Sequence, residues 1–110
     1  TASSPKSYTW LKKDKTGLLV FEGMFDLLSL AAMQPITVYE SDILVLNSIA
    51  FLSDVEKLLS NYDQVRLYLD NDNAGDSATE ALMRQFETAI DCRKEYVGFK
   101  DLNEKMMSCN

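Results

Sequence analysis

A stretch past the middle of the chain ends an apolar strand on two acids. Residues 65–69 alternate Val, Leu and Leu with Arg and Tyr, which is typical of a strand. Asp70 and Asp72 follow, and two residues so spaced on an extended backbone point to the same side. Neighbouring carboxylates repel each other unless a cation lies between them, so the pair predicts a divalent-metal site. Gly75 then allows a tight turn into a helix.

Two other kinds of protein place acids in a D-x-D pattern. An EF-hand loop needs acids at its fifth and twelfth positions, where this chain has Ala74 and Ala81, so a calcium loop is not expected. Phosphatases with an aspartyl nucleophile also place D-x-D after a buried strand. The chain matches their pattern only in part, because Ala74 stands where Thr or Val is usual. That class stays open.

A second apolar strand also ends on an acid. Residues 18–21 are continuously apolar, as in a strand that helices cover on both faces of a parallel sheet. Glu22 and Gly23 follow directly. Asp70 and Asp72 alone are equally consistent with ordinary turn residues, but an acid in the same place on another strand favours a shared site.

Strands and helices alternate along the chain. Apolar runs predict strands at 18–21, 43–46, 65–69 and 96–99. Helical spacing predicts helices at 24–33, at 54–62, from Gly75 to about residue 90, and around Met106 and Met107. The first of these is apolar nearly all round, so we expect it to be buried; residues 36–41 stay unassigned. This order predicts a compact α/β fold with about four parallel strands flanked by helices.

Parallel strands bring their carboxyl ends to one edge of the sheet, where ligands collect. Polar residues stand at each predicted strand end: Glu22, Asn47 and Ser48, Asp70 and Asp72, Lys100 and Asp101. We therefore expect one site, with Mg²⁺ on Asp70 and Asp72 and Glu22 as a third ligand or general base. Magnesium prefers oxygen ligands and serves phosphoryl and nucleotidyl transfer.

Charge and composition limit the possible functions. The 110 residues carry a net charge of −6, and the sequence shows no obvious basic face for nucleic acid. Any affinity for nucleic acid is therefore expected to come mostly from another domain or a bound metal. The chain has no histidine and only two cysteines, which excludes an ordinary Cys/His zinc site. No signal peptide or membrane-length apolar run is visible, so we expect a cytoplasmic protein without a membrane role.

Residues 1–16 show no periodicity and predict a flexible lead-in or linker before a domain at 17–110. The lysines of this segment are expected to form a solvated surface. Cys92 is expected in the core, and Cys109 is incidental.

Three segments together resemble a known family. Residues 22–26 read E-G-x-x-D, residues 70–75 read D-x-D-x-A-G, and residues 100–104 read K-D-x-N-E. In this order and spacing they resemble the Toprim domain of bacterial and phage DNA primases, over roughly residues 17–107. The resemblance implies a Rossmann-like α/β unit, as in topoisomerases, some nucleases and recombination mediators.

The resemblance also implies roles for single residues. Glu22 would be the acid/base residue, and Asp70 and Asp72 would coordinate Mg²⁺ or Mn²⁺. Asp26 and Asp101 match acids that primases keep near the metal. Lys100 would lie where nucleotide phosphate or template approaches. The motif glycines Gly23 and Gly75 support the site. Primases usually have a glycine-containing turn after the second strand, whereas this chain has Asn47, Ser48 and Ile49.

The function implied is magnesium-dependent nucleotidyl or phosphoryl transfer on nucleic acid, as in a DNA primase-like protein of a replication or mobile-element system. Primases carry a zinc-binding domain and a basic subdomain that these residues lack. We therefore expect a part of a longer protein, inactive alone, that meets single-stranded DNA and nucleotides through other domains of the same polypeptide. A Toprim-type nuclease and a non-catalytic module that binds DNA or protein are the alternatives.

Overall fold

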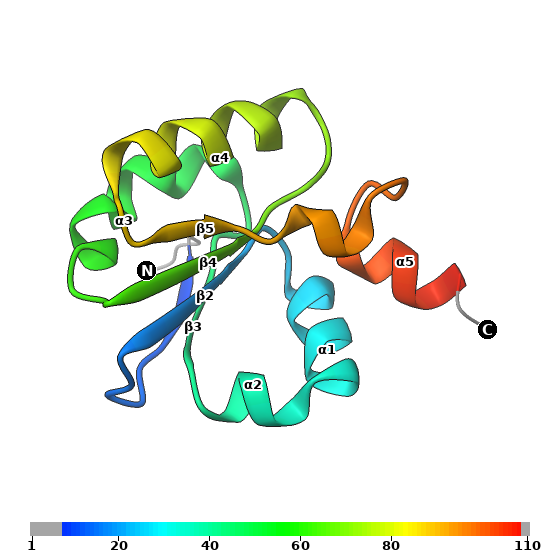
Figure 1. Ribbon diagram of the computed structural model, residues 1–110, viewed down its shortest axis with the longest axis horizontal. Coiled ribbons are helices and arrows are strands. Elements are labelled where there is room, and N and C mark those ends of the chain that lie inside the picture. The colour runs from blue at the N-terminus through cyan, green and yellow to red at the C-terminus, as the bar shows by residue number, and fades with distance from the viewer. Residues whose placement is uncertain (1–7, 109–110) are drawn as a thin grey trace, which may run out of the picture.

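A five-stranded sheet lies at the centre of the computed structural model, which describes residues 8–108 (Figure 1). The strands follow the order β1-β3-β2-β4-β5 across the sheet. Their bounds are Thr9–Leu11 (β1), Gly17–Phe21 (β2), Asp42–Val45 (β3), Gln64–Tyr68 (β4) and Ala89–Asp91 (β5). Strands β2 to β5 pair in parallel, and β1 joins β3 in antiparallel orientation. The predicted α/β fold with four parallel strands is confirmed.

Helices cover both faces of the sheet. Their bounds are Met24–Met33 (α1), Pro35–Tyr39 (α2), Leu52–Leu59 (α3), Asn73–Gln85 (α4) and Leu102–Ser108 (α5), with short 3₁₀ helices at Ile49–Phe51 (η1) and Arg93–Tyr96 (η2). Helices α3 and α4 lie on one face, and α1, α2 and α5 on the other (Figure 1). No helix in the described part of the chain is both long enough and apolar enough to span a membrane.

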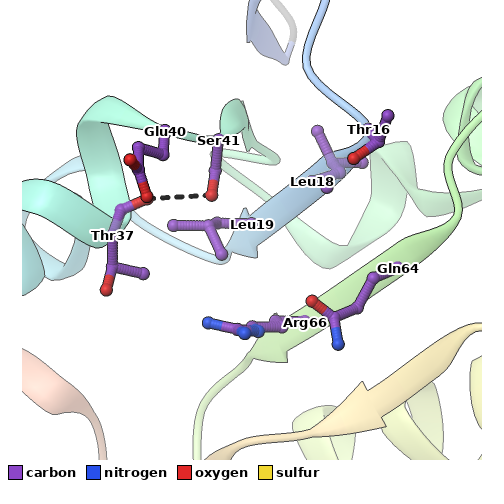
Figure 2. A pocket seen from close by; sticks show the side chains of 9 residues that line it. Thr16, Leu18, Leu19, Thr37, Glu40, Ser41, Gln64 and Arg66 are labelled. Atoms are coloured by element: carbon purple, nitrogen blue, oxygen red, sulfur yellow. Dashed lines mark hydrogen bonds between the residues drawn. The ribbon is translucent and has the colours of Figure 1, made fainter.

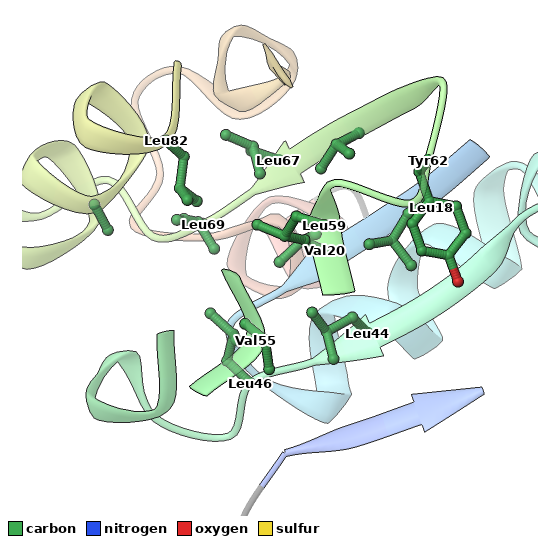
Figure 3. Packing of buried hydrophobic residues seen from close by; sticks show 12 residues of the cluster. Leu18, Val20, Leu44, Leu46, Val55, Leu59, Tyr62, Leu67, Leu69 and Leu82 are labelled. Atoms are coloured by element: carbon green, nitrogen blue, oxygen red, sulfur yellow. The ribbon is translucent and has the colours of Figure 1, made fainter. Parts of the chain in front are cut away.

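Each face of the sheet has its own apolar cluster. Leu18 and Val20 of β2 point to the α3–α4 face, where they pack with Leu59 and Leu82 (Figure 3). Leu19 and Phe21 of β2 point to the other face and join a second cluster. That cluster includes Leu30, Tyr96 and Leu102. The continuous apolar run of β2 is explained by burial on both faces.

Strand β1 corrects the lead-in predicted over residues 1–16. Residues 9–11 form an edge strand, and residues 1–7 lie outside the described part of the chain. Trp10 Nε1 donates to Tyr62 Oη at 3.0 Å, and Tyr62 Oη donates to the buried Asp42 carboxylate at 2.7 Å. These long-range side-chain hydrogen bonds order a segment that has no apolar period of its own.

The Asp42 carboxylate also holds the turn between β1 and β2. The backbone N–H groups of Lys13 and Lys15 donate to its Oδ1 at 2.8 and 3.1 Å. Burial alone would raise the pKa of Asp42, but these bonds and the one from Tyr62 outweigh it, and the pKa is lowered. A buried carboxylate with several donors is stabilised as the anion.

The fourth parallel strand is not where the sequence predicted it. Residues 96–99 form the end of η2 and a turn in which Gly98 has a φ of 94°, so the predicted strand there is wrong. Strand β5 at Ala89–Asp91 takes its place, and α4 ends at Gln85, short of the predicted residue 90. β5 has only three residues and lies at the sheet edge. Because its apolar side chains continue the helical spacing of α4, the hydrophobic periodicity predicts a longer helix there and no strand.

Helix α1 has the predicted bounds but is not buried all round. Its buried side includes Leu27 and Leu30. On its other side Phe25 is 71% exposed and Leu28 is 55% exposed. The expectation of a fully buried helix is therefore wrong, and α1 presents an apolar surface to solvent.

Candidate metal centre

Glu22 and Asp70 meet because β2 and β4 pair in parallel. Phe21 stands opposite Tyr68 in the register of the two strands, so both acids follow at the same edge of the sheet. The Glu22 side chain reaches across, and its Oε1 accepts a hydrogen bond from the backbone N–H of Asp70 at 3.1 Å. The strand register therefore fixes one carboxylate beside the other.

Asp72 completes a group of three carboxylates. One oxygen each from Glu22, Asp70 and Asp72 lies within 4.8 Å of the other two. Asp72 has extended backbone angles (φ −141°, ψ 176°) and caps α4, since its Oδ1 accepts from the Gly75 N–H at 2.8 Å. The structure thus brings together the three residues that the sequence put forward as metal ligands.

Gly75 is needed for close packing. It lies in the first turn of α4, not before the helix as a turn residue. A Cβ at this position would lie 2.0 Å from the backbone oxygen of Asp70 and 2.9 Å from its carbonyl carbon. Only glycine lets the helix approach the segment that carries Asp70 so closely.

A second group of acids adjoins the first. Oxygens of Asp26, Asp70 and Asp101 also lie within 4.8 Å of one another. Asp26, in the first turn of α1, is only 4% exposed and accepts from the backbone N–H of Asn103 at 3.1 Å. Asp101 Oδ1 accepts from the N–H of Glu104 at 2.8 Å. These two acids therefore anchor the start of α5 at the same sheet edge.

The negative charge of this edge is not neutralised. Burial, followed by the charges of Glu22, Asp26, Asp101 and Asp72, raises the pKa of Asp70 to about 7. Burial, with the charges of Asp101 and Glu22, raises the pKa of Asp26 to about 6, although N–H donors oppose the rise.

Within residues 8–108 no lysine or arginine pairs with these acids; Lys12 pairs with Asp14, and Arg93 with Asp91. All the atoms that could ligate a metal here are carboxylate oxygens, and no cationic side chain in this part of the chain compensates their negative charge. This chemistry fits a hard divalent cation.

The acids lie in and beside one cleft of about 310 Å³. We call it the acidic cleft; the predicted residues that line it are Glu22, Gly23, Asp26, Asn47, Ser48, Asp70 and Asp101. Asn47 has a left-handed φ of 65°, which asparagine tolerates better than most residues. The turn after β3, where the resemblance to primases predicts a glycine, therefore forms without one. The Ser48 side chain accepts from the Ala50 N–H at 3.2 Å and caps η1.

Lys100, like Asp72 and Gly75 of the predicted residues, does not line the acidic cleft. It lines a neighbouring hollow with Asn71 and residues 97–99. Its backbone oxygen accepts from the Asn71 N–H at 2.5 Å, and its own N–H donates to Glu104 Oε1 at 3.1 Å. Its backbone thus ties the loop before α5 to the end of β4.

Two residues that the sequence analysis missed hold the same loop. Asn71 Nδ2 donates to the backbone oxygens of Phe99 at 2.9 Å and Tyr96 at 3.3 Å. The buried Tyr96 hydroxyl donates to the Leu69 oxygen at 2.6 Å. The position of Asn71 between the two acids of the D-x-D pattern was the one available signal for its role.

A different hollow, of about 250 Å³, lies where β2 and β4 begin (Figure 2). Arg66 and Gln64 of β4 line it, with Glu40 and Ser41 after α2. Glu40 is the only carboxylate among its lining residues, so this hollow cannot offer the set of acids found at the opposite edge.

Comparison with known proteins gives one family and a set of similar folds. A family model described as Toprim-like matches residues 19–106. The crystal structure of the primase fragment of the bacteriophage T7 primase-helicase protein is similar, with a TM-score of 0.66 and 19% identity over 86% of this chain and 40% of that one.

A second similar structure is that of the bacteriophage T7 lagging-strand DNA polymerase interacting with primase domains of two gp4 subunits bound to an RNA/DNA hybrid and dTTP. Its TM-score is 0.65, with 19% identity over 86% of this chain and 48% of that one. The chain thus spans less than half the length of either structure. No curated protein sequence matches it.

The Gly75 contact predicts an unusual glycine effect. Alanine is normally favoured over glycine inside a helix by about 1 kcal/mol. We expect Gly75→Ala instead to lower the free energy of unfolding by about 2 kcal/mol or more, because the new Cβ overlaps the Asp70 carbonyl. Urea denaturation measures the change.

Gly17→Ala is the matched control. A Cβ there meets no atom closer than the Gln64 oxygen at 3.9 Å, so the change should stay within about 1 kcal/mol. A Gly75→Ala variant as stable as the wild type would contradict the close contact.

The raised pKa values predict a pH dependence of the metal-free protein. The folded state holds protons on Asp70 and Asp26 that the unfolded chain releases, so their stabilisation is full below the ordinary pKa of 3.8 and is lost as pH rises through about 6 and 7. In EDTA the Tm should therefore fall between about pH 5 and about pH 8.

Asp42 and Asp91 have lowered pKa values, so their contribution is lost only at more acid pH than this window. The Asp70→Asn variant should show a flatter profile. A Tm that stays constant or rises toward pH 8 would speak against the repulsion among these acids.

Proposed function

The chain belongs to the Toprim-like family, and we propose that it is a magnesium-dependent nucleotidyl-transfer domain of a DNA primase-like protein. One observation carries the proposal: the carboxylates of Glu22, Asp70 and Asp72 converge within 4.8 Å at the carboxyl edge of the sheet. The similar folds of bacteriophage T7 primase structures support it.

Asp70 and Asp72 would hold the ion, Mg²⁺ or Mn²⁺, with Glu22 as a third ligand. When bound, the ion would neutralise phosphate charge and orient the reacting groups. Glu22 would also act as general base, holding a proton from the attacking hydroxyl; its carboxylate is kept in place by the Asp70 N–H.

The other acids and glycines support this arrangement. Asp26 and Asp101 add negative charge and fix α5 against the cleft. Gly75 permits the close approach of α4 to the Asp70 backbone, and Gly23, Asn47 and Ser48 line the acidic cleft. Lys100 would meet the phosphates of a strand that approaches over residues 97–100.

Other domains of the same polypeptide would bring single-stranded DNA and nucleotides. The chain spans 40% and 48% of the two T7 structures, and its net charge of −6 gives little affinity for phosphates. We therefore propose that the domain is inactive alone and works in a cytoplasmic replication or mobile-element protein.

A metal-dependent stabilisation tests the proposed ligands. With Mg²⁺ or Mn²⁺ at about ten times its Kd, binding to the folded state adds about 1.4 kcal/mol and raises the Tm by about 5–10 °C. Asp70→Asn together with Asp72→Asn should abolish this shift, because the variant keeps the shape of the side chains but loses both charges. Thermal unfolding monitored by circular dichroism gives the result.

The exposed acids Glu80 and Glu87 provide the control. Their replacement by Gln removes the same charge from elsewhere on the domain and should leave the shift intact. If Mg²⁺ or Mn²⁺ at millimolar concentration does not raise the Tm of the wild type, the three carboxylates do not form a metal site.

Product analysis of the full-length protein that contains this chain tests the reaction. We expect a template and nucleotides to give longer oligonucleotides, and Glu22→Gln to slow this step by about 10²–10⁴-fold, as loss of a general base does. Shortened oligonucleotides would instead identify a Toprim-type nuclease. An unchanged rate in Glu22→Gln would remove Glu22 from the chemistry.

A further inference from the structure

An exposed aromatic ring stands at the mouth of the acidic cleft. Met24 and Phe25, the first two residues of α1, line the cleft beside its acids. Met24 is 40% exposed and Phe25 is 71% exposed. Phe25 belongs to neither apolar cluster of the described residues, so packing inside the domain does not explain a phenylalanine here.

The backbone that carries Phe25 is held on both sides. Asp26, the next residue, is buried and accepts from the Asn103 N–H at 3.1 Å. Ser29 Oγ lies 2.9 Å from the Phe25 backbone oxygen, to which it donates, and 3.1 Å from the Asn103 side-chain oxygen. The first turn of α1 is therefore fixed against α5, which holds the backbone of Phe25 in place beside the cleft.

Charge limits what can lie on this ring. Glu22, Asp70 and Asp101 line the same cleft and repel a bare anion. A ligand that fills both parts of the cleft needs a flat apolar portion for the ring and an anionic portion that a bound cation can hold. A nucleotide has both, and its base can stack on an aromatic side chain.

We propose that Phe25, with Met24 beside it, is the base-stacking platform of the metal centre, where the base of a nucleotide lies while its phosphates face the ion. This inference rests on the proposed function. Neither side chain donates or accepts a strong hydrogen bond, so the contact would accept any base.

NMR titration of the chain with dATP in the presence of Mg²⁺ tests the proposal, with inorganic triphosphate as the probe that lacks a base. We expect dATP to shift the Phe25 ring signals. Phe25→Ala should weaken dATP binding about 5- to 150-fold, which corresponds to about 1–3 kcal/mol for one stacked base. Phe25→Trp should keep the affinity, and triphosphate should bind every variant equally.

Tyr39→Ala is the matched control, because Tyr39 is 75% exposed on α2 and does not line the cleft. It should bind dATP as the wild type does. Equal dATP affinity of wild type and Phe25→Ala, or no dATP binding to the wild type, would overturn the platform.

The Tm shift with Mg²⁺, measured on the same samples, separates this failure from failure of the proposed function. A normal shift with no effect of Phe25→Ala would leave the metal centre standing and refute the platform alone. If another domain of the full-length protein covers Phe25 and dATP does not contact the ring, Phe25 belongs to a docking surface, and the platform is refuted as well. A missing metal shift would refute both proposals.

Discussion

The parallel register between β2 and β4 is the constraint on which the rest of the site depends. Because Phe21 stands opposite Tyr68, the two strands release Glu22 and Asp70 at the same edge of the sheet. A shift by one residue would exchange the two faces of a strand and part these acids. Gly75 completes the arrangement, since it lets α4 approach the Asp70 carbonyl and place the Asp72 cap beside the other two carboxylates.

The fold supports a cluster of charges that does not stabilise it. Burial and mutual repulsion raise the pKa of Asp70 and of Asp26, so these acids cost stability when ionised. The two apolar clusters and the hydrogen bonds of Asn71 and Tyr96 hold the edge together against this repulsion. A site that is costly without a ligand and rigid in geometry is typical of a preorganised binding centre.

Elements set by local pattern could be predicted, and those set by distant contacts could not. Strand β2 and residues 43–45 of β3 are continuously apolar, and β4 alternates apolar side chains with Arg66 and Tyr68. These strands, and the acids that follow β2 and β4, are therefore visible in the sequence. β1 depends on hydrogen bonds among Trp10, Tyr62 and Asp42, which no local pattern reveals. β5 is short and continues the period of α4, and the exposure of Phe25 follows from which side of α1 meets the sheet.

The central claim is that one divalent ion binds where the acids of β2 and β4 meet. Titration of the ¹⁵N-labelled chain with Mn²⁺ tests it most directly, because the paramagnetic ion broadens the signals of nearby nuclei. The account predicts that the amide signals of Glu22, Asp70 and Asp72 vanish first. Broadening that is no stronger there than at exposed acids such as Asp54 and Glu80 would contradict it.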